Sequence, residues 1–241
     1  MKNKQIKYSI YVLLLMYVIY QAYTNIKASS LTYYDFEFLM EGLIRTIYIS
    51  VVSIVIGTFF GVIFGYLKST SGKIANLFLS GFLDILRSVP LIIQFILFYS
   101  FLGIFEIDID IFWVGAIVLS TYTSAFVTEV VRAGIDSVPQ TTRRASRSLG
   151  LTYWQDYRYI VFPLGIRTVF PAWISIVLSV IKDSALVSVI GYLELLKTTE
   201  ELISKTQEAL LLLIGVGFFY FIISYPISLY ASHLERKLKY D

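Results

Sequence analysis

Four arginines gather in one polar stretch, RAGIDSVPQTTRRASRSLGLTYW, between residues 132 and 154 of a chain that is otherwise 57% hydrophobic. Their guanidinium groups could make charge-assisted hydrogen bonds to carboxylates or carbonyls of a partner protein. They could equally contact lipid headgroups and act only as topology signals. The choice between these roles depends on the elements that position Arg132, Arg143, Arg144 and Arg147.

The composition indicates an all-α, polytopic membrane protein. The 241 residues have a mean hydropathy of +0.72 and only 15% are charged, and several apolar runs reach the length of about 18 residues that a helix needs to span a bilayer. These runs do not alternate as barrel strands would. The chain has no cysteine and one histidine, His233, so thiol chemistry is excluded and no metal site is expected.

Hydropathy and flanking charges predict about six transmembrane helices. The first is interpreted as a retained span rather than a signal peptide, because no clear cleavage site follows it. The expected spans are 7–23, 42–67, 75–102, 112–132, 164–190 and 208–232. The predicted domains are 1–39, a transmembrane helix with an extracytoplasmic linker; 40–236, the main transmembrane domain with a loop at 133–163; and 237–241, a cytoplasmic tail.

The distribution of basic residues predicts that both termini are cytoplasmic. With the six spans above, the opposite side keeps only Lys27, Arg45, Lys182, Lys197 and Lys205 of the twenty lysines and arginines. The remaining fifteen lie on the side of the termini, as the positive-inside rule requires of the cytoplasmic side.

The arginine-rich loop is expected to hold a short helix of about ten residues. Pro139 suits the first turn of a helix and Gly150 the position just past its end. Ala145 and Leu149 lie four apart, with Ser146 adjacent, which gives a face of small residues with one apolar anchor. A helix this short is marginal alone in water, so it should pack against something.

Three motifs resemble the permease subunits of ATP-binding-cassette importers, in particular the polar amino-acid uptake branch. EVVRAGIDSVPQTTRRASRSLG is similar to the EAA loop of that family, LRSVPLIIQF to its R-G-T-P-L-L-V-Q motif, and IKDSALVSVIGYLEL continues the match. The resemblance covers about residues 40–236. The loop residues that match are Glu129, Arg132, Ile135, Ser137, Val138, Pro139, Ala145, Leu149 and Gly150.

The resemblance implies a type I ABC importer permease fold in a bacterial inner membrane. It also implies that the loop helix is a coupling helix seated in a groove of a cytoplasmic ATPase subunit. The implied partners are ATPase subunits, a second permease subunit, an extracytoplasmic amino-acid-binding protein and membrane lipids, with no nucleic acid. The expected coupling residues are Glu129, Arg132, Ser137, Pro139, Arg143, Arg144, Ala145, Ser146, Leu149 and Gly150.

The chain has no G-x-x-x-x-G-K-[ST] phosphate loop, so ATP and Mg²⁺ should be bound by the partner and no bond chemistry is expected here. The family's G-Q-x-E-A-A is replaced by residues 141–146, and Arg144 reverses the charge of the family's Glu. Either the ATPase carries complementary acids, or this chain is the degenerate half of a heterodimeric permease. We favour the heterodimer.

A second set of residues is predicted to line the substrate pathway. Pro90 should kink the third span where a polar Gln94 follows it, although a kink can also serve packing alone. Lys182 and Asp183 are interpreted as a local ion pair near the outer end of the fifth span. In the family that the chain resembles, a polar or acidic residue often stands at the position of Ile176, so the resemblance argues against direct recognition of a cationic amino acid by this half. The candidate pathway residues are Arg87, Pro90, Gln94, Trp173, Ser175, Ser179, Lys182, Asp183 and Ser184.

These observations predict one half of the pathway of an ATP-driven amino-acid importer, for a polar substrate such as glutamate, aspartate or glutamine. An ion-coupled secondary transporter is the alternative, but it should place carboxylates inside the spans, and Asp84 and Asp183 lie near predicted ends. A membrane-embedded enzyme should show clustered catalytic residues, and the sequence shows none.

Overall fold

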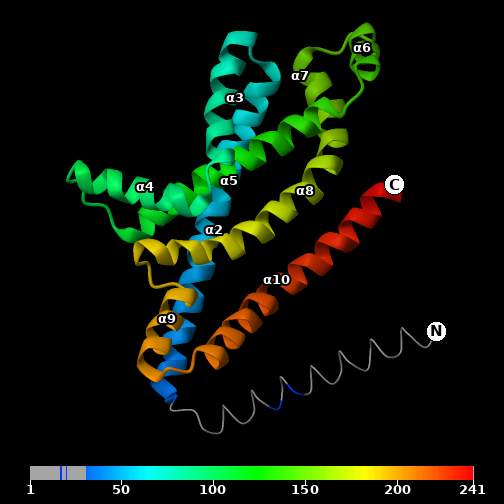
Figure 1. Cartoon of the computed structure of the whole chain (residues 1–241). Coiled ribbons are helices and arrows are strands. Elements are labelled where there is room, and N and C mark those ends of the chain that lie inside the picture. Colours follow the sequence, from blue (N-terminus) through cyan, green and yellow to red (C-terminus); the bar gives the residue numbers. More distant parts are fainter. Residues whose placement is uncertain (1–16, 18–19, 21–30, 241) are drawn as a thin grey trace, which may run out of the picture.

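The computed structural model describes Tyr17, Tyr20 and residues 31–240, and within these residues the chain is helical with no strand. Figure 1 shows the order and arrangement of the elements. They are α2 (Tyr33–Thr70), α3 (Lys73–Ser88), α4 (Leu91–Ile104), α5 (Ile111–Asp136), α6 (Gln140–Ser148), α7 (Tyr153–Asp156), the π-helix η1 (Tyr157–Val161), α8 (Phe162–Asp183), the 3₁₀-helix η2 (Ser184–Ile190), α9 (Leu195–Thr206) and α10 (Ala209–Tyr240).

The expected all-α membrane architecture is confirmed. Four helical stretches of the described residues are long and apolar enough to cross a bilayer, namely 33–70, 111–136, 153–190 and 209–234, and the bent pair α3–α4 provides a fifth if it counts as one span. The first expected span, 7–23, lies outside the described residues apart from Tyr17 and Tyr20. The second and fifth spans begin about ten residues earlier than hydropathy indicates.

The third expected span, 75–102, is wrong as a single kinked helix. The chain breaks at Val89 and Pro90, and α3 and α4 meet at 105°. Val89 is extended (φ −84°, ψ 129°), as the residue before a proline tends to be, and proline supplies no N–H to continue the helix. The Gln94 amide closes this elbow by donating to the Leu86 carbonyl (2.7 Å) and the Val89 carbonyl (2.8 Å).

The helices α2 and α5 pack against each other and run in the same direction, because successive glycines of α2 meet successive residues of α5. A row of glycines permits this close approach. A Cβ added to Gly57 would lie 2.6 Å from Thr123 Cβ, and one added to Gly61 would lie 2.5 Å from Val127 Cβ. Gly65 repeats the pattern one turn later. The glycine spacing therefore serves helix packing, as expected for small residues four apart in a membrane helix.

The molecule has two ends, which we call the loop end, with α6, and the α9 end (Figure 1). At the α9 end the fully buried Glu194 caps α9 by accepting from the Leu196 and Lys197 N–H groups (2.9 and 2.8 Å). It also accepts from Thr46 Oγ1 of α2 (3.3 Å) and Tyr220 OH of α10 (3.2 Å). One carboxyl group thus joins α2, α9 and α10.

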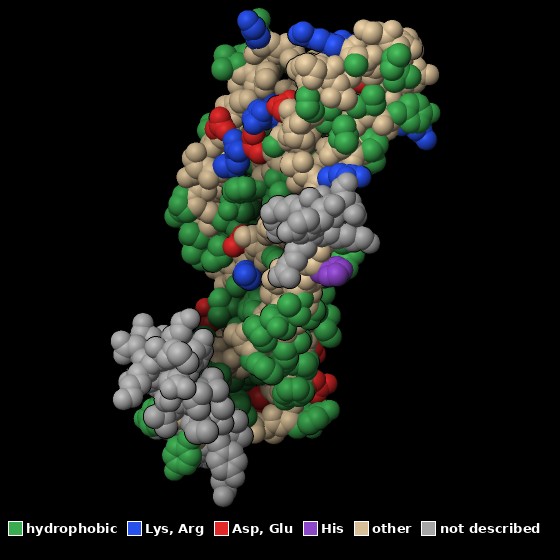
Figure 2. All heavy atoms as spheres, turned by 90° about the vertical axis from the view of Figure 1, so that its right-hand side faces the viewer, with side chains coloured by type: hydrophobic (Ala, Val, Ile, Leu, Met, Phe, Trp, Pro, Cys, Tyr) green, Lys and Arg blue, Asp and Glu red, His purple; other side chains and the backbone are tan. Residues whose placement is uncertain are grey.

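On the face shown in Figure 2, hydrophobic side chains are widespread, whereas Lys and Arg lie mostly in the upper part of the view. Large exposed apolar side chains occur along α2, α3, α4 and α10, including Phe59, Phe78, Phe101 and Phe218. Such a surface is stable only against lipid or another apolar protein surface.

Candidate functional site

The loop helix α6 forms where the sequence predicts a short helix. Pro139 immediately precedes it with φ −56° and ψ 135°, and Gly150 follows with φ 85°, a left-handed conformation that favours glycine. The Leu151 N–H returns to the Ser146 carbonyl (3.2 Å) and the Gly150 N–H to the Arg147 carbonyl (3.0 Å), which ends the helix.

One side of α6 is fixed to the polypeptide that follows it. Ser146 is only 2% exposed, and its hydroxyl donates to Asp156 Oδ1 (2.5 Å). Arg143 Nε donates to Asp156 Oδ2 (3.2 Å), and Asp156 is itself buried. The sequence predicts that Ser146 shares a face with Ala145, and this is wrong: Ser146 lies on the inner side of α6. Arg143 is also paired inside the loop.

The other side of α6 is exposed. Five residues spaced at three and four positions point outward together, and the last is 83% exposed. They are Thr141, Arg144, Ala145, Ser148 and Leu149. We call this set the α6 face: small side chains flanked by one cation, with an apolar residue at its end.

The acidic and basic residues that precede α6 pair within the chain. Glu129 binds Lys68 and Arg132, the latter at 3.0 Å, and lies 3.5 Å from Arg87. Arg132 also pairs with Asp136 (2.8 Å). Ser137 donates its hydroxyl to the Gly134 carbonyl (2.7 Å). Of the four loop arginines, Arg144 and Arg147 form no ion pair within the described residues, although Arg147 Nε donates to the Arg143 carbonyl (3.3 Å).

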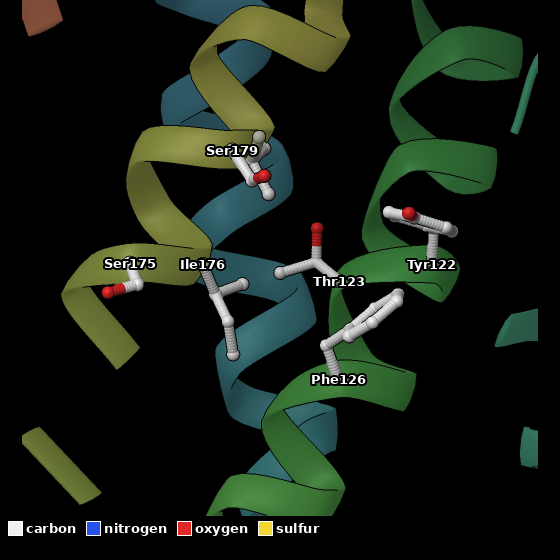
Figure 3. A pocket seen from close by; sticks show the side chains of 7 residues that line it. Tyr122, Thr123, Phe126, Ser175, Ile176 and Ser179 are labelled. Atoms are coloured by element: carbon white, nitrogen blue, oxygen red, sulfur yellow. The ribbon is translucent and has the colours of Figure 1, made fainter. Parts of the chain in front are cut away.

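A cavity of about 200 Å³ lies between α5 and α8 (Figure 3). This volume is below the ~300–1,000 Å³ of drug-sized ligand pockets, so only a small ligand would fit. Ser179 and Ile176 face α5 across the cavity, while the Ser175 hydroxyl is directed away and donates to the Pro171 carbonyl (3.3 Å). The lining residues are Tyr122, Thr123, Phe126, Ser175, Ile176, Ser179 and Val180, none of which is charged.

The other candidate pathway residues lie elsewhere. Trp173 Nε1 donates to Thr58 Oγ1 of α2 (2.9 Å), and the buried Ser184 donates to the Ile181 carbonyl (2.8 Å). Lys182 and Asp183 do not form the expected ion pair among the salt bridges of the described residues, because neighbouring helical positions point in different directions.

The R-S-V-P motif occupies the α3–α4 elbow instead of this cavity. Arg87 pairs there with Asp84 and Glu129, and Pro90 begins α4. Gln94 lines a separate, apolar cavity of about 510 Å³ between α3, α4 and α5.

Two residues that sequence reasoning missed complete these arrangements. Asp156 holds the inner side of α6, and Lys68 holds Glu129. Asp156 was detectable as a lone acid shortly after a basic helix, whereas nothing in the sequence around Lys68 indicates a partner 61 positions away.

The sequence that forms α5, the exposed loop helix and the returning α8 matches a known family. The family model described as "Binding-protein-dependent transport system inner membrane component" matches residues 57–240.

The chain belongs to this family. As a binding-protein-dependent transport component it is a membrane permease, and the matched region contains α3 to α10 and the part of α2 from Gly57 to Thr70.

Relatives of this permease agree with that assignment. It is 31% identical over 203 residues to the glutamine transport system permease protein GlnP of Escherichia coli K12, covering 83% of this chain and 93% of the relative. It is 30% identical over 210 residues to the probable glutamine ABC transporter permease protein GlnM of Bacillus subtilis, covering 87% and 97%.

A solved structure shares the fold. A crystal structure of an amino acid ABC transporter with histidines matches with a TM-score of 0.78 at 31% identity, covering 83% of this chain and 94% of the matched chain. The permease fold expected from the sequence motifs is therefore confirmed.

Proposed function

We propose that this permease forms half of the translocation pathway of an ATP-driven importer for a polar amino acid, with glutamine or glutamate and aspartate as the first candidates. The glutamine permeases among its relatives support this substrate class. The cavity between α5 and α8 is lined by no charged residue that could neutralise a charged side chain, which favours the uncharged glutamine among these candidates.

The observation that carries the coupling role is the α6 face. A helix of nine residues has its inner side fixed by Asp156 and presents Thr141, Arg144, Ala145, Ser148 and Leu149 outward. Small residues allow close seating in a groove, and an exposed leucine offers an apolar anchor. We propose that an ATPase subunit, which binds ATP and Mg²⁺ and hydrolyses the nucleotide, supplies that groove.

Arg144 gives the partner a defined chemistry. It is exposed on the α6 face, while Arg143 is already paired with Asp156. An acidic residue in the facing groove would form a charge-assisted hydrogen bond with it. The loop end then faces the cytoplasm with both chain termini, and the α9 end faces the binding protein.

A second permease subunit completes the pathway in this proposal. The cavity between α5 and α8 has no charged lining residue, so the ionic groups of a zwitterionic amino acid would have to be met by water or by residues of another subunit. A heterodimer, in which the other half carries the family's usual loop, accounts for the reversed charge at Arg144.

The test replaces Ala145 by Asp in the complete transporter, reconstituted in proteoliposomes with its ATPase. The Ala145→Asp side chain should prevent close seating, reduce ATP-driven uptake at least tenfold and lower the amount of ATPase that co-purifies. The matched control is Ala75→Asp, at an exposed position in the first turn of α3, where a negative charge suits the helix N-terminus.

Normal uptake by Ala145→Asp would remove α6 from the coupling mechanism. If no ATPase co-purifies with the wild-type permease in mild detergent, the result would argue for an ion-coupled transporter instead.

A further inference from the structure

The part of the molecule between the loop helix and the α3–α4 elbow is joined by a network of charges. Glu129 is the centre of this network, because it contacts Lys68 of α2, Arg87 of α3 and Arg132 of its own helix. Asp84 and Asp136 extend it at its two edges. We call these six residues the Glu129 network.

The network is partly withdrawn from solvent. The side chain of Lys68 is 9% exposed and that of Glu129 is 21% exposed, so their attraction is screened less than that of a surface pair. Removal of the carboxylate would leave a nearly buried lysine without its partner, which is costly. The Lys68–Glu129 pair should therefore hold α2 and α5 together strongly at this point, while α3 is joined to them through the longer Arg87–Glu129 contact.

The Glu129 network lies between the loop helix α6 and the α3–α4 elbow. On one side, Glu129, Arg132 and Asp136 form a stripe along the last turns of α5, and α6 follows after Ser137–Pro139. Glu129 is ten residues from Pro139, about 15 Å along a helix. On the other side, Arg87 is in the last turn of α3, directly before the elbow at Val89 and Pro90.

Of the three cations that contact Glu129, Arg87 is the one whose contact can change most easily. It is shared between Asp84 and Glu129, its contact with Glu129 is long at 3.5 Å, and its Nε is buried without a hydrogen-bond partner in the described part of the chain. A two-pronged contact of Arg87 with Glu129 would satisfy that N–H. Lys68 and Arg132, by contrast, already hold Glu129 firmly.

We propose that Glu129 is a positioning residue that transmits movement of the loop helix to the α3–α4 elbow through Arg87. Glu129 then acts inside the permease and does not contact the ATPase. This inference rests on the proposed coupling function, since it concerns how motion of α6 reaches the membrane helices. The Arg87–Glu129 contact then adds an ionic link between α5 and the elbow to the packing of α3 and α4 against α5.

The first test measures amino-acid uptake and ATP hydrolysis by the complete reconstituted transporter. Glu129→Gln and Arg87→Gln should each lower the amount transported per ATP by roughly two- to thirtyfold, the range expected for residues that carry coupling. The double variant should be no worse than Glu129→Gln, because both changes break one contact. Arg87→Lys should restore part of the ratio.

The matched control is Arg45→Gln, which removes a cation from the exposed Arg45–Glu41 pair at the α9 end. It should leave the transport ratio unchanged. An unchanged ratio in Glu129→Gln, or losses in the double variant that multiply those of the single variants, would overturn the inference. If the Glu129→Gln variant fails to assemble, the Arg87→Gln variant still tests the inference, because Lys68 and Arg132 keep Glu129 paired in that variant.

The second test needs no transport. The N–H groups of Ile93 and Gln94 bond to the Pro90 carbonyl at the elbow (2.9 and 3.2 Å). Their hydrogen exchange in the purified full-length permease should accelerate in Glu129→Gln and Arg87→Gln but not in Arg45→Gln. Unchanged exchange refutes the link between Glu129 and the elbow. If exchange accelerates in these variants but the wild-type protein shows no ATP-driven uptake, the proposed importer function is refuted while the link between Glu129 and the elbow stands.

Discussion

Single residues fix the loop end and the α9 end, in each case through a buried carboxyl group. Asp156 accepts from Ser146 and Arg143 and so decides which face of α6 is outward. Glu194 accepts from two N–H groups and two hydroxyls and so joins three helices. Both carboxyls are satisfied by hydrogen bonds, as groups removed from water must be.

Glu194 predicts a pH dependence of stability at the α9 end. Burial raises the pKa of the Glu194 carboxyl from 4.5 to about 6. The folded state therefore binds the proton more tightly than the unfolded state, so stability is highest below about pH 4.5 and decreases as the pH rises through about 6. A shift of this size corresponds to about 2 kcal/mol.

The measurement is the unfolding temperature of the purified permease between pH 4.5 and 7. Glu194→Gln should lose this part of the pH dependence, whereas Glu200→Gln, at an exposed position on α9, should keep it. Equal pH profiles for the wild type and Glu194→Gln would show that this carboxyl does not change its protonation in the folded protein.

At the scale of elements, contact between α2 and α5 determines how the bundle is built. Their glycine row brings two spans together so closely that Thr128 Oγ1 reaches the Gly61 carbonyl at 3.4 Å. Packing between backbones replaces the hydrophobic effect, which is weak inside lipid.

Gly61→Ala should therefore destabilise the permease. The new Cβ would lie 2.5 Å from Val127 Cβ, and overpacking of this kind costs about 1–3 kcal/mol. The matched control is Gly215→Ala on α10, where a Cβ meets nothing within 4 Å and alanine favours the helix. Thermal unfolding in detergent measures both, and a Gly61→Ala variant as stable as the Gly215→Ala variant would contradict the close packing.

At the scale of the whole molecule, the two ends should lie on opposite sides of the membrane. The chain has no cysteine, so Ser204→Cys on α9 and Ser148→Cys on α6 each introduce a single thiol at an exposed position. In intact cells a membrane-impermeant maleimide should label the Ser204→Cys variant only. The Ser148→Cys variant should react after the membrane is dissolved and the protein denatured. The reverse pattern would invert the proposed orientation.

The sequence by itself determined the helical class, most of the span positions and the short loop helix. Hydropathy, Pro139 and Gly150 act within one turn or one span, and a lipid environment enforces helices wherever apolar runs are long enough. The same local signals placed a kink at Pro90 but not its size: the chain breaks there into two helices at 105°, because hydropathy does not register the direction of the chain.

Only the tertiary structure decided which polar groups meet. Glu194 contacts Thr46 148 positions away, Lys68 contacts Glu129 61 positions away, and Trp173 contacts Thr58 115 positions away. Such pairs depend on which helices are neighbours and on their rotation about their axes. These are set by the packing of whole faces, such as the glycine row of α2 against α5, and no short stretch of sequence specifies them.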